Sequence, residues 1–189
     1  MPIVRDRYDG IAILLGGDCI QKNVEFAQSV VARLRPAVII ILITIVREVR
    51  SLFNVFVYGT LKPGEINYFR YCAGKTCQER LAYAWGKLYA LCLGYPGMAE
   101  GTERIQGVIL TFEDEGVLEQ LDQLESYSPS RPAHENEYQR REIIVYDGSG
   151  KPLDKAWTYI MSDQNIRRFK GVWLPSGCWS SYDSQRGEF

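Results

Sequence analysis

From Phe53 onward, the apolar residues of the chain come in short runs separated by turn residues, which is typical of a sheet protein. The turn-rich stretch Tyr146 to Pro152 predicts that the two runs beside it form a hairpin. One helix is predicted among the strands, over Asp114–Ser126. The pattern therefore predicts an α+β fold, a small antiparallel or mixed β-barrel with few helices. The expected strands are Asn54–Tyr58, Ala82–Tyr89, Gln106–Phe112, Tyr138–Tyr146 and Ala156–Met161.

Residues 1–52 follow a different pattern, which predicts strand, helix and strand. The helix is expected over Gln21–Arg35, where apolar residues recur at helical spacing and Pro36 stops the helix. About 50 residues are too few to bury both faces of a βαβ pair. We therefore expect an N-terminal extension of unknown role at 1–52, a domain at 53–170 and a C-terminal tail at 171–189.

Two features of the extension were tested for function. Gly16-Gly17-Asp18 follows an apolar run and faintly resembles a phosphate-binding turn, but it lacks the further glycine of a dinucleotide motif and the Gly-Lys-Ser/Thr of a P-loop. A separate nucleotide-linked role is the least favoured hypothesis. The apolar segment Ala37–Val46 is about half the length that a membrane helix needs, and its β-branched residues favour a buried strand. No membrane association is expected.

Composition limits the function classes. The 22 basic and 23 acidic residues leave a net charge of −1, which does not favour binding to nucleic acid. The 5 cysteines are scattered without a CxxC pair, and His134 is the only histidine, so a zinc site is poorly supplied. We expect ordinary reduced thiols, no metal and a cytoplasmic protein.

A carboxylate stands out on the predicted helix. With about 100° per residue, Glu125 falls between Leu118 and Leu121 on the apolar face, whereas Glu119 faces water. Burial of a carboxylate without a cationic partner raises its pKa, which suits a general acid and base. Two alternatives stay open: the helix frays before Glu125, or Arg140 or Arg141 pairs with it.

The stretch "FVYGTLKPGE" (Phe56 to Glu65) joins the first strand to a turn. Gly59 allows the backbone to come close to a ligand, and successive amide N–H groups can hold a carboxylate. The turn is therefore a candidate binding site, with a plain loop as the alternative.

Taken with "LDQLES", this stretch resembles the γ-glutamylcyclotransferase-like family, and most of all its short γ-glutamylamine cyclotransferase branch. Further segments occur in the order of that family, and the resemblance covers about Phe53 to Met161: "GKLYAL", "YPGM", "QGVILTF", "EYQRREIIVY" and "AWTYI". Two features depart from it. Ser126 stands where a glycine is common, and the loop from there to Tyr138 is long.

The resemblance implies that Tyr58, Gly59, Thr60 and Leu61 cradle the γ-glutamyl group and that Glu125 is the catalytic acid and base. Tyr138 is expected to line the pocket. The implied reaction is cyclisation of a small γ-glutamyl amide to 5-oxoproline and a free amine, without a cofactor. A non-catalytic module that binds small carboxylates on the same fold is the alternative.

Overall fold

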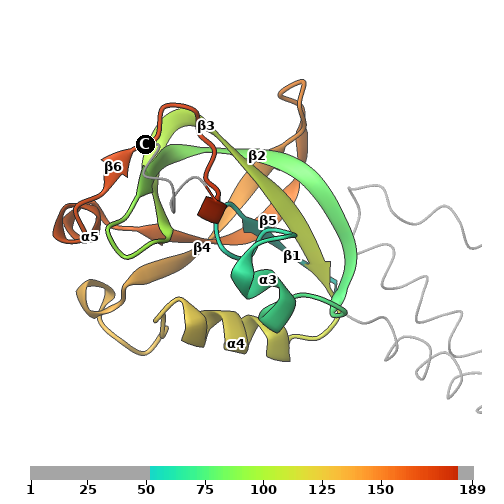
Figure 1. Ribbon diagram of the computed structural model, residues 1–189. Coiled ribbons are helices and arrows are strands. Elements are labelled where there is room, and N and C mark those ends of the chain that lie inside the picture. The colour runs from blue at the N-terminus through green and yellow to red at the C-terminus, as the bar shows by residue number, and fades with distance from the viewer. Residues whose placement is uncertain (1–51, 183–189) are drawn as a thin grey trace, which may run out of the picture. The chain divides into compact units, whose positions relative to one another are not determined.

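The computed structural model describes residues 52–182 (Figure 1). The strand–helix–strand expected at 1–52, with Gly16-Gly17-Asp18 and Ala37–Val46, lies outside the described residues. The chain from Phe53 forms a mixed sheet with three α-helices and a short 3₁₀ helix over Ala133–Glu135. The elements in order are β1 (Phe53–Val57), α3 (Ile66–Tyr71), β2 (Thr76–Ala90), β3 (Pro96–Phe112), α4 (Gly116–Leu124), β4 (Tyr138–Tyr146), β5 (Pro152–Met161), α5 (Asp163–Arg168) and β6 (Val172–Trp173).

The six strands are ordered β3-β1-β5-β4-β2-β6, and β3 also pairs with β2. This extra pairing closes the order into a ring of strands, around which the helices lie in Figure 1. The β1–β5 and β2–β4 contacts are each one residue pair, Val55 with Trp157 and Tyr83 with Tyr146. The α+β fold with few helices is thus confirmed, but the ring has no continuous barrel wall.

The hairpin predicted at Tyr146 to Pro152 is confirmed, since β4 and β5 pair antiparallel along their lengths. The expected start of β3 at Gln106 was wrong, because the strand begins at Pro96. Its first half carries glycines at 97 and 101 and exposed polar residues, which break the apolar alternation. Pairing with the long strand β2 supplies its hydrogen bonds instead of local propensity.

The apolar core has two parts, which lie on opposite faces of β1. Val55 and Val57 pack into one part with residues of β3, α4 and β5, whereas Phe56 and Tyr58 pack into the other. This alternation follows from the two-residue period of a strand. The end of β1 is consequently held from both sides.

The C-terminal tail packs on the domain as far as it is described. Trp179 is 1% exposed within the second core part, and its carbonyl accepts a hydrogen bond from Lys62 Nζ. Ser181 donates to the buried carboxylate of Glu65 through its N–H (3.2 Å) and its hydroxyl (2.5 Å). These contacts stabilise the loop that follows the Tyr58–Leu61 turn.

Across residues 52–182, no helix is long and apolar enough to cross a membrane. The four cysteines in this range are free thiols; Cys72 is buried and the other three are exposed.

Candidate active site

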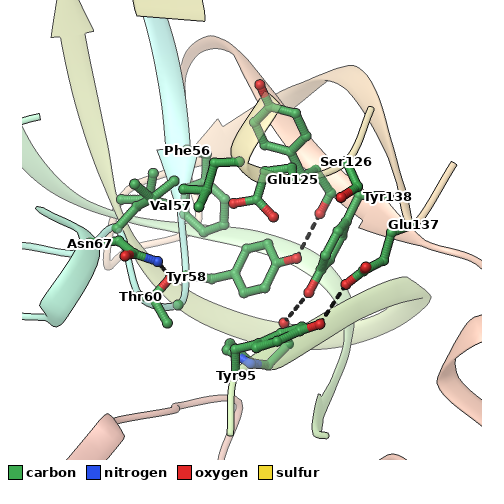
Figure 2. A pocket seen from close by; sticks show the side chains of 15 residues that line it. Phe56, Val57, Tyr58, Thr60, Asn67, Tyr95, Glu125, Ser126, Glu137 and Tyr138 are labelled. Atoms are coloured by element: carbon green, nitrogen blue, oxygen red, sulfur yellow. Dashed lines mark hydrogen bonds between the residues drawn. The ribbon is translucent and has the colours of Figure 1, made fainter. Parts of the chain in front are cut away.

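A pocket of about 300 Å³ opens where β1 ends (Figure 2). Residues from β1, its following turn, the β2–β3 loop, the end of α4 and strands β4 and β5 meet there. The lining residues are Phe56, Val57, Tyr58, Gly59, Thr60, Leu61, Asn67, Tyr95, Pro96, Leu124, Glu125, Ser126, Glu137, Tyr138 and Tyr159. Every site residue predicted from the sequence is among them.

Glu125 stands immediately after α4, which ends at Leu124. Its N–H donates to the carbonyl of Leu121 (2.9 Å), so the last helical hydrogen bond still orients the residue. The apolar face of the helix therefore directs the side chain inward, as its position in the sequence predicted. Figure 2 shows the side chains of Glu125, Tyr58 and Tyr138 pointing toward one another.

Burial raises the pKa of the Glu125 carboxyl to about 8, and the negative charge of Glu137 adds to that rise. Neither arginine considered as a partner pairs with it: Arg140 binds Asp122 and Arg141 binds Glu100. Within residues 52–182, the Glu125 carboxyl makes no ion pair. A carboxyl that titrates near neutral pH and faces a pocket can accept and return protons.

Asp122 connects the end of α4 to the sheet. Its carboxylate accepts hydrogen bonds from Arg140 Nη1 (2.7 Å) on β4 and from the Tyr159 hydroxyl (2.8 Å) on β5. The Arg140 guanidinium also lies 5.0 Å from the ring centroid of Trp157. This partly buried network fixes the helix end from which Glu125 projects.

The backbone turns sharply after the acid. Ser126 has φ +50°, in the left-handed region that glycine occupies at low cost. The conformation explains why a glycine suits this position. It sends the chain into the long loop that returns to the pocket at Glu137.

The Tyr58–Leu61 turn forms the opposite wall. The amide N–H groups of Gly59, Thr60 and Leu61 donate no hydrogen bond within the described range 52–182. The Thr60 hydroxyl accepts from Asn67 Nδ2 (3.0 Å), and the Asn67 N–H donates to the Thr60 carbonyl (3.0 Å). Asn67 on α3 thus shapes the turn while leaving its amides available for an anionic ligand.

Gly59 has a structural requirement that the sequence did not reveal. A Cβ atom at this position would lie 2.6 Å from Pro96 Cγ, well inside van der Waals contact. The missing side chain therefore allows the turn to pack on the β2–β3 loop. Close approach of a ligand can only be an additional reason for this glycine.

The tyrosines of the pocket are held by backbone groups. The Tyr58 hydroxyl donates to the Tyr159 carbonyl (2.7 Å) and accepts from the Met98 N–H (3.2 Å), and Tyr138 donates to the Pro96 carbonyl (2.7 Å). Burial raises the pKa of both phenols. They are neutral walls that fix the pocket shape, and neither suits the role of a base.

Four functional candidates were missed from the sequence: Asn67, Tyr95, Glu137 and Tyr159. Tyr95 belongs to the "YPGM" segment and Tyr159 to "AWTYI", so both lay inside segments noted for the resemblance. Glu137 directly precedes Tyr138. Their pattern gave no sign of a pocket, because each comes from a different element.

No group of three or more histidine, cysteine, aspartate or glutamate residues within 52–182 is placed to hold a metal ion. The described pocket combines free backbone N–H donors with one proton-exchanging carboxyl. This arrangement can bind a small carboxylate and transfer protons beside it.

Comparison with known proteins assigns the fold to a family. Residues 55–181 match the family model described as gamma-glutamyl cyclotransferase, AIG2-like. The gamma-L-glutamyl-butirosin B gamma-glutamyl cyclotransferase of Niallia circulans is 34% identical over 107 residues, which cover 57% of this chain and 65% of that protein. A putative gamma-glutamylcyclotransferase of Vibrio cholerae is 33% identical over 125 residues, 66% of this chain and 93% of that protein.

Among solved structures, YkqA from Bacillus subtilis aligns with a TM-score of 0.51 at 23% identity. The alignment covers 73% of this chain and 43% of YkqA, so the chain spans less than half of that protein. At this identity the likeness concerns the fold alone.

Proposed function

The chain belongs to the gamma-glutamyl cyclotransferase, AIG2-like family, and we propose that it is an enzyme that cleaves small γ-glutamyl amides by cyclisation. The α-amino nitrogen of the substrate attacks its own γ-carbonyl carbon. The new C–N bond closes the 5-oxoproline ring, and the bond to the amide nitrogen breaks. One proton moves from the attacking nitrogen to the departing amine, so no water is consumed.

Glu125 carries this proposal. As a carboxylate it takes a proton from the α-amino group, and as a carboxylic acid it gives a proton to the leaving nitrogen. A pKa of about 8 makes both forms accessible near neutral pH. Because the reaction is intramolecular, the protein needs only to fold the substrate into the reactive geometry and exchange protons.

The amides of Gly59, Thr60 and Leu61 are proposed to hold the negative charge of the bound substrate. They line the same pocket as Glu125 and have no acceptor within the described chain. Donors fixed in advance stabilise a carboxylate or a developing oxyanion without reorganising. Tyr58 and Tyr138 are proposed to pack against the γ-glutamyl group.

The domain limits and the location are part of the proposal. All of the pocket-lining residues lie between Phe56 and Tyr159, which supports 53–170 as the catalytic domain with an extension at 1–52 and a tail at 171–189. A cytoplasmic location stays a prediction. The relative from Niallia circulans is named for a γ-glutamyl amide substrate, which supports an amine as the leaving group here.

The proposed activity is tested by incubating the full chain with a panel of γ-glutamyl amides and measuring 5-oxoproline and amine by mass spectrometry. We expect the two products in equal amounts, with no free glutamate. Glutamate in place of 5-oxoproline would indicate hydrolysis by water. Binding of the amides without any product would favour the non-catalytic module.

A further inference from the structure

The pocket contains a second carboxylate, Glu137, and no positive charge. No lysine, arginine or histidine is among the residues that line the described pocket. Glu137 makes no ion pair within residues 52–182. A substrate that enters this pocket therefore meets two acidic side chains without a compensating protein cation.

Glu137 is held in a defined position. Its Oε1 accepts a hydrogen bond from the Tyr95 hydroxyl (2.7 Å), which Figure 2 shows beside the cavity. Its backbone carbonyl accepts from Asn165 Nδ2 (3.0 Å), and its N–H donates to the Ser126 carbonyl (3.4 Å). A carboxylate fixed at three points is placed in advance for a ligand, because little conformational entropy remains to be lost on binding.

Burial shows which end of the pocket Glu137 occupies. Tyr58, Leu61 and Tyr138 are 6% exposed or less and form the inner end, whereas Glu137 and Tyr95 are partly exposed. The γ-glutamyl group occupies the inner end in the proposed reaction. The leaving amine then extends outward, past Glu137 and the ring of Tyr95.

The charges of the substrate decide what suits this outer position. The γ-glutamyl group has one carboxylate and one ammonium, which the turn amides and Glu125 already serve. A neutral leaving group would partly desolvate Glu137 without replacing its water contacts, which is unfavourable. An ammonium group would form a charge-assisted hydrogen bond with Glu137 and contact the face of Tyr95.

We propose that Glu137 selects γ-glutamyl amides whose leaving amine carries a second, positively charged amino group. This inference rests on the proposed cyclisation activity. It narrows the substrate class to amides of diamines and other polycationic amines.

The test compares two substrates of equal length, the γ-glutamyl amides of 1,5-diaminopentane and of n-hexylamine. They differ in a terminal ammonium against a methyl group. A hydrogen bond to a charged group corresponds to roughly a tenfold to hundredfold preference in kcat/KM for the diamine amide. Glu137→Gln keeps the acceptor for Tyr95 but removes the charge, so the preference should fall toward unity. Glu119→Gln, which removes a charge from the exposed face of α4, should keep the wild-type preference.

The outcomes separate the two proposals. Equal turnover of both substrates by the wild-type chain overturns the role of Glu137 and leaves the cyclisation proposal intact, and this result does not depend on how any variant folds. A preference that persists in folded Glu137→Gln also overturns it. Absence of 5-oxoproline from both substrates refutes the cyclisation proposal, and the inference with it.

Discussion

Replacement of Glu125 by glutamine tests the proton-transfer role and the burial of the carboxyl together. Glutamine has nearly the same shape but cannot exchange a proton at neutral pH. Since general acid and base catalysis contributes about a hundredfold to ten-thousandfold, Glu125→Gln should lower kcat by at least two orders of magnitude. For the wild type, kcat/KM should rise with pH up to about 8, as the carboxyl ionises.

The same change should raise stability, by an amount that depends on pH. Folding raises the pKa of Glu125 from 4.5 to about 8, so the folded state binds the proton more tightly than the unfolded state. The stability that this proton contributes is complete below pH 4.5 and is lost as the pH rises through 8. At about pH 7, the loss amounts to ~3 kcal/mol at ~1.4 kcal/mol per pKa unit.

Glutamine does not ionise, so Glu125→Gln avoids that loss. Urea unfolding should show a small gain in stability at pH 5 and a gain of roughly 3 kcal/mol at pH 7. Glu119→Gln on the exposed face of the same helix serves as the control and should change neither activity nor stability appreciably. A stability difference that does not vary with pH would refute the raised pKa. Turnover within tenfold of wild type would refute the catalytic role.

Three further changes test the surroundings of the acid. Ser126→Gly should raise the unfolding free energy by about 0.5–1 kcal/mol because glycine tolerates φ +50°, whereas Ser130→Gly in the same loop should lower it; thermal melts that rank them otherwise would contradict the strain. Gly59→Val should lower both stability and 5-oxoproline release because its side chain overlaps Pro96, while Gly148→Val, with nothing near its Cβ, should behave like wild type. A chain of residues 52–182 should keep its turnover, since every lining residue lies between Phe56 and Tyr159, and full loss of activity in a folded shortened chain would place part of the site in 1–51.

The features that the sequence predicted correctly depend on local order. The two-residue period of β1 and the apolar face of α4 are encoded within a few residues, so the end of the strand and the inward direction of Glu125 could be predicted. The Tyr58–Leu61 turn and Tyr138 were found in the same way, with the help of the family resemblance. In the structure all of them line one pocket.

Partner choice and burial were decided by the tertiary structure alone. Arg140 was available to Glu125 by composition, but the register of β4 places it on Asp122, which leaves the acid unpaired. The parallel contact of β1 with β5 brings Tyr159 to the end of the first strand, although about a hundred residues separate them in the chain.

The same reason explains why Glu137 escaped the sequence analysis. Its neighbour Tyr95 comes from the β2–β3 loop, and its backbone is held by Asn165 of α5. The sequence by itself determined which residues project inward from each element. Only the folded ring of strands determined which of them meet, because electrostatic coupling and desolvation depend on distances between segments that are remote along the chain.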